Sequence, residues 1–370
     1  MIIDQDLAQF SDVAFKTAVV LYLLALAVSL VYYGMVRTAT EARRERAALL
    51  GAQTPAASAE ARLGAPEKVL VGSGGGGVHN ETNTEPPAAD TVSALASPTE
   101  ESALPARLQA DAILRKIGRA DRLGGVTQAL VLLAIAVHAA HLILRGVSAQ
   151  RFPWGNLFEY VSVVSLFAMI VSTIVLRRKA MRVMWPWILT PIVALLFYGG
   201  AKLYAQTAPV VPALQSHWFV VHVSTVSIGA SIGLVSGMAS IMYLVRKAQP
   251  RGQEKGLLGV IAGPLPDAAK LDALAYRSAV WALPIFGLGV VFGAIWAEAA
   301  WSRFWGWDPK ETVSFITWIL YAAYLHARAT PGWRGSRSAW INVLAFATMV
   351  FNLFFINMVV SGLHSYAGLN

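Results

Sequence analysis

The sequence contains no cysteine among its 370 residues. The chain therefore cannot build a disulfide bond, a thiolate metal site, an iron–sulfur cluster or a cysteine nucleophile from its own residues. Charged residues are also scarce, at 14% against about 25% in an ordinary soluble domain. Apolar residues make up 56% of the chain. This composition argues against a water-soluble enzyme and predicts a protein whose apolar surface faces a lipid bilayer.

Several stretches are long and apolar enough to cross a bilayer, since a helical span needs about 20 apolar residues. There are eight of them, at about 14–36, 125–145, 156–177, 184–204, 219–245, 278–297, 312–329 and 339–361. We therefore predict an all-α, polytopic membrane protein with about eight transmembrane helices.

The spacing of the spans predicts three regions. These are an N-terminal transmembrane helix (1–36), a cytoplasmic linker (37–124) and a C-terminal membrane domain (125–370). The middle of the linker, 51–106, is rich in Ala, Gly, Ser, Thr, Pro and Glu and lacks the apolar residues of a core. We therefore expect the linker to be largely disordered.

The basic residues predict the orientation, because cytoplasmic loops of membrane proteins carry an excess of Lys and Arg. With the N-terminus outside, six of the 30 basic residues fall on the outer side and the other 24 on the cytoplasmic side. The outer six are Lys16, Arg145, Arg151, Lys202, Arg303 and Lys310. Both termini are thus expected outside.

Tryptophan is concentrated between residues 296 and 318, in and around one outer connection. Five of the twelve tryptophans are Trp296, Trp301, Trp305, Trp307 and Trp318. An interfacial aromatic belt explains one or two of them. The i, i+3, i+4 spacing of Trp301, Phe304 and Trp305 instead predicts an aromatic face on a short helix along the membrane surface. From the pattern alone, a belt and a platform for a flat apolar ligand are equally good interpretations.

The residues that follow form a helix start signal. Asp308, Pro309 and Glu311 suit the N-cap, first and third positions of the next span. We therefore interpret these carboxylates as helix caps rather than as general acids or bases.

Histidines are the candidate metal ligands, because neutral imidazole is the usual protein ligand of haem iron. His222 and His364 lie near the outer ends of the fifth and eighth spans, on the side of the tryptophans. Two imidazoles beside an aromatic platform would suit a planar metal macrocycle. His217, in the outer loop, is a weaker candidate.

Three further histidines lie within predicted spans. His138 and His141 are one turn apart, and they could be ligands or interhelical hydrogen-bonding groups. His326 lies about 22 Å below the outer surface at 1.5 Å per residue, too deep to share a ligand with the outer pair. From its position alone, a structural hydrogen-bonding role is slightly favoured.

The run from Trp296 to Glu311, WAEAAWSRFWGWDPKE, resembles the WWD signature of haem-handling membrane proteins. Gly306, between Trp305 and Trp307, departs slightly from the commonest spacing. Further stretches resemble the CcsA (ResC) branch of this family, which serves System II cytochrome c biogenesis. They lie at 152–159, 216–224, 271–277, 324–328 and 362–366, so that the resemblance covers roughly residues 125–370.

The resemblance implies a set of binding residues. His222 and His364 would be the axial ligands of one haem b iron at the outer face, and His326 would be a membrane-embedded ligand. The segment 296–311 would hold the haem, and its binding residues would be Trp296, Trp301, Trp305, Trp307 and Asp308. In the family a second embedded histidine comes from the partner CcsB (ResB), so we expect a separate partner of that kind.

The resemblance also implies a function. The chain would carry haem to the outer face of the bacterial cytoplasmic (inner) membrane. There it would present haem for covalent attachment to apocytochrome c, whose Cys-x-x-Cys-His motif supplies the thiols. It would act as a subunit of the System II holocytochrome c synthase (haem lyase). Thiol-reducing proteins would be involved indirectly, and no nucleic acid is expected as a partner.

Other points stay open at this stage. No side chain stands out as a general acid or base. Arg303 and Lys310 are the nearest outer cations and are candidates for neutralising haem propionates. The alternatives are a haem exporter that delivers to a separate chaperone, and a transporter of an unrelated solute.

Overall fold

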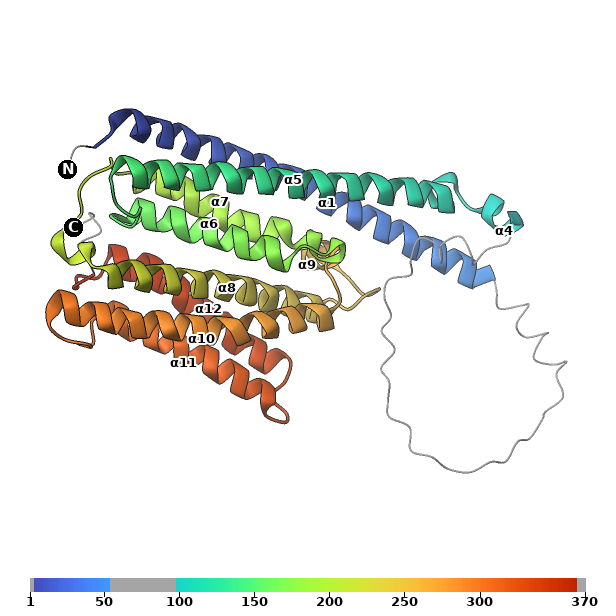
Figure 1. Cartoon of the computed structure of the whole chain (residues 1–370). Coiled ribbons are helices and arrows are strands. Elements are labelled where there is room, and N and C mark those ends of the chain that lie inside the picture. Colours follow the sequence, from blue (N-terminus) through green and yellow to red (C-terminus); the bar gives the residue numbers. More distant parts are fainter. Residues whose placement is uncertain (1–2, 54–97, 365–370) are drawn as a thin grey trace, which may run out of the picture. The chain divides into compact units, whose positions relative to one another are not determined.

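The structure of the chain, a computed structural model, describes residues 3–53 and 98–364 (Figure 1). Within these ranges every regular element is a helix, which confirms the predicted all-α fold. The α-helices are α1 (Gln5–Gln53), α4 (Pro98–Ala103), α5 (Ala110–Ser148), α6 (Leu157–Val175), α7 (Trp185–Lys202), α8 (His217–Ala248), α9 (Gly256–Ala262), α10 (Ala268–Trp301), α11 (Pro309–Ala329) and α12 (Ser336–Phe351). Short helices are η1 (Ala106–Leu108), η2 (Lys179–Met184), η3 (Pro212–Gln215) and the π-helical η4 (Asn352–Ile356).

The chain divides into two compact units. The larger contains residues up to 33 and from 123 onward, and the smaller lies within 34–122. The described part of the smaller unit is helical, and within it Arg46 pairs with Glu101 at 2.6 Å. Residues 54–97, half of the linker expected to be largely disordered, lie outside the described residues, and the described parts of the linker are mostly helical.

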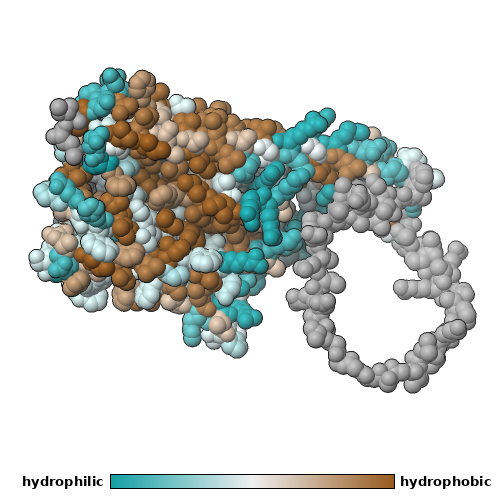
Figure 2. Space-filling model, in the orientation of Figure 1, coloured by the Kyte–Doolittle hydropathy of each residue, from teal (hydrophilic) through white to brown (hydrophobic). Residues whose placement is uncertain are grey.

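Seven described helices are long and apolar enough to cross a membrane, namely α1, α5, α6, α7, α8, α10 and α12 with its continuation η4. They correspond to seven of the eight predicted spans. On the face of the larger unit seen in Figure 2, apolar side chains cover the helices between more polar ends. Together these features make the protein an all-α, polytopic membrane protein.

The remaining predicted span, 312–329, is α11. Its 21 residues extend about 32 Å at 1.5 Å per residue, and it packs against α10 and α12 (Figure 1). It is not among the seven helices that are apolar enough to cross a membrane, and it carries Lys310, Glu311, His326 and Arg328. That α11 crosses the bilayer stays a prediction.

Helices α8 and α10 form the most extensive contact in the larger unit. Glycines permit their close approach: a Cβ added at Gly229 would lie 2.7 Å from Cα of Phe286, and one at Gly289 would lie 2.8 Å from Cα of Val226. Small residues at such crossings are typical of helix pairs in membranes. The glycines therefore hold α8 and α10 in a fixed register, and this register positions His222.

One end of the larger unit collects the chain segments of the candidate site. The backbone of Asp4, before α1, bonds to Ser148 at the end of α5 at 3.1 Å. The indole of Trp296, near the end of α10, donates to the carbonyl of Ala213, before α8, at 2.9 Å. The backbone N–H of Leu363, after η4, bonds to Asp308 at the start of α11. The predicted outer residues thus lie at a common end.

Candidate functional site

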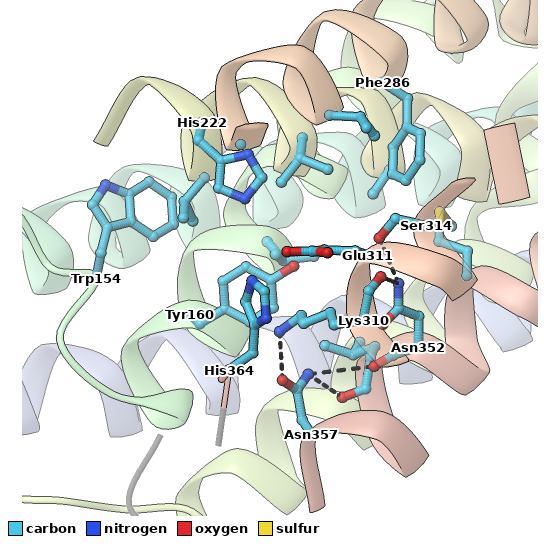
Figure 3. A pocket seen from close by; sticks show the side chains of 18 of the residues that line it. Trp154, Tyr160, His222, Phe286, Lys310, Glu311, Ser314, Asn352, Asn357 and His364 are labelled. Atoms are coloured by element: carbon cyan, nitrogen blue, oxygen red, sulfur yellow. Dashed lines mark hydrogen bonds between the residues drawn. The ribbon is translucent and has the colours of Figure 1, made fainter. Parts of the chain in front are cut away.

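A pocket opens between α6, α7, α8, α10, α11 and the end of α12 (Figure 3). Most of its lining is apolar, from residues such as Phe286 and Leu195. Two of the predicted ligands, His222 and His364, line this pocket, as do Trp296 and Trp305 of the tryptophan segment. The structure therefore brings the main predicted site residues together.

His222 lies in the second turn of α8 and faces α10. Its Nδ1 lies 2.7 Å from the carbonyl oxygen of Gly289. A carbonyl can only accept, so Nδ1 carries the proton and Nε2 carries the lone pair. The ring stacks on Trp296, with centroids 5.8 Å apart and planes 13° apart. Gly293 makes room for it, because a Cβ there would lie 2.6 Å from Cε1 of the imidazole.

His364 is fixed by Asp308. Its Nδ1 lies 2.8 Å from Oδ2 of the carboxylate, and the backbone N–H of Leu363 donates to Oδ1 at 2.8 Å. An ionised carboxylate can only accept, so His364 also holds its proton on Nδ1 and its lone pair on Nε2. The edge of its ring meets Trp296 at 5.8 Å and Trp301 at 5.4 Å.

The charges at this pair are well defined. Burial opposes ionisation of Asp308, but the hydrogen bonds from His364, Leu363 and Lys310 outweigh it and lower the pKa of the carboxyl from 3.8 to about 2. Burial lowers the pKa of His364, and the neighbouring carboxylate offsets this only in part. The pair is therefore a neutral imidazole beside a carboxylate, the arrangement that orients metal-binding histidines in many proteins.

Asp308 is also the predicted helix cap. Its side chain accepts from the backbone N–H of Lys310 at 3.2 Å, and Glu311 accepts from the backbone N–H of Asp308 at 3.1 Å. The capping box with Pro309 at the first turn is confirmed. The bond to His364 could not be predicted from the local sequence, because the two residues are 56 positions apart in the chain.

The predicted short helix around Trp301, Phe304 and Trp305 is wrong. Trp301 is the last residue of α10, and Ser302 ends that helix in the left-handed conformation, with φ 55°. Residues 302–308 form an irregular loop. Glu311 stabilises this loop by accepting from the backbone N–H of Gly306 at 2.9 Å in addition to its cap bond.

The tryptophans of the segment have different positions. Trp296 is buried (1% exposed) and touches both histidine rings. Trp305 lines the pocket, whereas Trp301 lies outside the lining and supports His364. Trp307 is 67% exposed and meets the pocket only through Trp305, at 5.8 Å.

The other histidines lie elsewhere. His138 and His141 are fully buried between α1, α5 and α6, where they bond to Ser162 and Ser11 at 2.9 Å. Interhelical hydrogen bonding, one of the two roles left open for them, is what the structure shows. His217 is exposed at the start of α8 and does not line the pocket.

His326 is exposed in the last turn of α11. Helix geometry places it about 27 Å from Asp308 at the opposite end of α11. It therefore lies far from the pocket, as the sequence analysis expected.

The pocket also contains residues that the sequence analysis did not single out. Trp154 lies in the connection before α6 and Tyr160 in the first turn of α6, whereas Asn352 begins η4 and Asn357 follows it (Figure 3). A hydrophobic pattern does not distinguish lipid-facing residues from pocket-facing ones, so no signal marked them.

The start of α6 is anchored by buried ion pairs. Glu159 (0% exposed) pairs with Arg145 and Arg151, each at 2.8 Å. The arginines also donate to the carbonyls of Ala205 and Ala208 in the loop after α7. These bonds pair the buried Glu159 carboxylate with two cations and fix one wall of the pocket.

Comparison with known proteins agrees with this arrangement. The family model described as "Cytochrome C assembly protein" matches residues 123–364. The chain is 34% identical over 245 residues to the cytochrome c biogenesis protein CcsA of Guillardia theta, which is 61% of this chain and 80% of that protein. It is 32% identical over 273 residues to CcsA of Parasynechococcus marenigrum (strain WH8102), covering 65% and 86%. It is 31% identical over 236 residues to CcsA of Chlamydomonas reinhardtii, covering 62% and 65%.

The matched range contains the whole pocket, both pocket-lining histidines and the tryptophan segment. The chain therefore belongs to the cytochrome c assembly protein family, as a member of its CcsA type, and has a role in cytochrome c biogenesis.

Proposed function

We propose that the pocket binds haem b through His222 and His364 and presents it at the outer membrane face for covalent attachment to apocytochrome c. The observation that carries this proposal is the pair of histidines that line one apolar pocket, each with its Nδ1 proton donated to a fixed acceptor. In both rings Nε2 is then the nitrogen that can bind a metal. Trp296, in contact with both rings, supplies a rigid apolar support for them.

The chemistry on haem requires little from this chain. Each thiol of the Cys-x-x-Cys-His motif adds its sulfur to one carbon of a vinyl group and its proton to the other, with no net oxidation or reduction. The residues described here would bind haem, hold its orientation and exclude water. Thiol-reducing proteins would act indirectly, by keeping the substrate thiols reduced.

Spectroscopy of the purified protein tests the ligand assignment. The wild-type protein from haem-replete cells should show a Soret band, and His222→Ala and His364→Ala should each lose most of it. Added imidazole should restore part of the band by filling the empty coordination position. His217→Ala, an exposed histidine five residues before His222 on the same helix, is the matched control and should keep its haem. Normal haem content in both pocket variants would reject the proposal.

We further propose that His326 supplies one ligand to a second, transient haem site at an interface with a CcsB (ResB) partner, whose own histidine supplies the other. Exposure of His326 on α11 supports this, since a lone imidazole facing lipid would be costly without a partner. Haem would enter there from the cytoplasmic side and move outward to the pocket.

In the complex with the CcsB partner, substitutions at the two proposed sites should have different effects on haem loading. His326→Ala should empty both the inner and the outer site, whereas His364→Ala should leave the inner site loaded. An outer site that loads normally in His326→Ala would exclude the entry role.

A haem exporter that delivers to a separate chaperone would use the same pocket. Thioether formation distinguishes the two functions: membranes with this chain, the CcsB partner and apocytochrome c should yield the covalent product without another haem carrier. Haem release without thioether product would favour the exporter.

A further inference from the structure

Lys310 brings a positive charge into the pocket. It lies in the first turn of α11, and its side chain points toward Asn357 and the region of His364 (Figure 3). The ammonium donates a hydrogen bond to Oδ1 of Asn357 and lies 5.6 Å from the ring centroid of Tyr160. Both neighbours are neutral, so neither supplies a negative charge to pair with the ammonium.

The nearby carboxylates have other partners. Glu311 pairs with Arg303 at 3.1 Å and accepts from two backbone N–H groups of the loop. Asp308 accepts from His364 and from the backbone of Leu363. Across residues 3–53 and 98–364, no ion pair within 4.0 Å joins Lys310 to a carboxylate. A cation in a mostly apolar pocket is costly unless an anion pairs with it.

A small polar region surrounds this ammonium. Asn357 and Asn352 are buried, with exposed fractions of 3% and 8%, and Nδ2 of Asn352 donates to Ser314 at 2.8 Å. Oδ1 of Asn352 is buried without a hydrogen-bond partner. Asn352 begins and Asn357 follows the π-helical turn η4, a type of distortion that often occurs at functional sites. The pocket thus has a polar corner around Lys310 in a lining that is mostly apolar.

The other outer cation near the tryptophan segment has a different environment. Arg303 pairs with Glu311 and lies over the ring of Trp301 at 5.6 Å. It does not line the pocket. Of the two cations considered from the sequence, Lys310 is therefore the one positioned to meet a ligand.

We propose that Lys310, assisted by Asn357, forms a carboxylate-binding subsite of this pocket, which selects a planar apolar ligand that carries an acidic side chain. The inference rests on the proposed function, since with haem as the ligand the acidic group is a propionate. The subsite anchors one edge of the haem while the two histidines bind the iron, so it fixes the rotation of the macrocycle in the pocket.

Esterification of the ligand tests this subsite. The apoprotein, purified from haem-starved cells in detergent, is titrated with haem and with haem dimethyl ester, and Kd is measured from the Soret absorbance. A hydrogen bond to a charged group predicts a preference for haem of about tenfold or more in the wild type. Lys310→Met should weaken haem binding by that factor and leave the ester unchanged. Lys310→Arg should keep part of the preference.

Lys202→Met is the matched control, because Lys202 is an exposed lysine at the end of α7 outside the pocket. This variant should retain the wild-type preference. The same haem-to-ester ratio in wild type and Lys310→Met would overturn the subsite while leaving haem binding intact. Equal weakening of both ligands in Lys310→Met would also overturn it, because Lys310 would then act only on the fold of the pocket. If neither ligand binds the wild type, both this inference and the proposed function fail.

Discussion

Asp308 both caps α11 and positions His364. Variants that separate the loss of stability from the loss of haem affinity test whether the positioning role is real. The carboxylate of Asp308 caps α11 through the backbone of Lys310 and also holds the imidazole of His364. Both donors bond to Oδ2, whereas Leu363 bonds to Oδ1. Substitution Asp308→Ala removes all of these bonds at once.

The magnitudes of the two losses differ. Loss of an N-cap costs about 1 kcal/mol of stability. The pKa of Asp308, lowered to about 2 from 3.8, corresponds to about 2 kcal/mol favouring the ionised form in the folded state. This contribution is present above about pH 4 and disappears as the pH falls toward about 2. Loss of a carboxylate that orients a metal-binding histidine typically reduces metal affinity by about 10- to 100-fold.

Ser216→Ala provides the matched control. Ser216 caps α8 by accepting from the backbone N–H of Trp218 at 3.3 Å and does not line the pocket. Its removal should cost up to about 1 kcal/mol of stability with little change in haem affinity. Asp308→Ala should cost about 1–2 kcal/mol and weaken haem binding by about 10- to 100-fold.

Asp308→Asn should give an intermediate result. An amide oxygen can replace Oδ2 but carries no charge, and the amide nitrogen then faces the N–H of Leu363. The assay is a haem titration of each detergent-purified variant beside its thermal unfolding midpoint. If Asp308→Ala binds haem as tightly as Ser216→Ala, the carboxylate acts only as a cap and the positioning role is refuted.

Three further predictions follow from the same geometry. Gly293→Ala should displace the His222 ring and lower the haem content measured from the Soret absorbance, because the new Cβ would lie 2.6 Å from the imidazole. Gly125→Ala is the control and should keep normal haem content, because no atom lies within 4 Å of its added Cβ. Because burial lowers the pKa of His364, its imidazole stays neutral down to the ordinary histidine pKa of about 6.5. Haem affinity should therefore not fall as the pH is lowered from about 8 to about 6.5, and should fall only at lower pH. A loss of affinity on lowering the pH from about 8 to about 7 in a titration series would contradict this. Reporter fusions at positions 75 and 368, which lie outside the described residues, should report cytoplasm and exterior respectively, and the reverse result would invalidate the predicted orientation.

Much of the helical framework could be predicted from the sequence. A run of about 20 apolar residues can satisfy its backbone in lipid only as a helix, so seven of the eight predicted spans coincide with long apolar helices. The cap at Asp308 was equally local, because Asp, Pro and Glu at the first helical positions interact within one turn. The prediction of a short surface helix was wrong. The residues around Trp305 form an irregular loop instead, and a hydrogen bond to Glu311 holds this loop in place.

The sequence by itself determined the residue types at the site: two histidines and a tryptophan cluster at the ends of predicted spans. Tertiary structure decided which of them meet. Trp301 supports His364 while Trp305 lines the pocket, and Lys310 rather than Arg303 faces the pocket. The physical reason is that hydrophobicity and helix periodicity act over a few residues, whereas these choices depend on contacts between distant segments. The bond from His364 to Asp308 spans 56 residues of sequence, and it forms only because α10, α11 and α12 pack together.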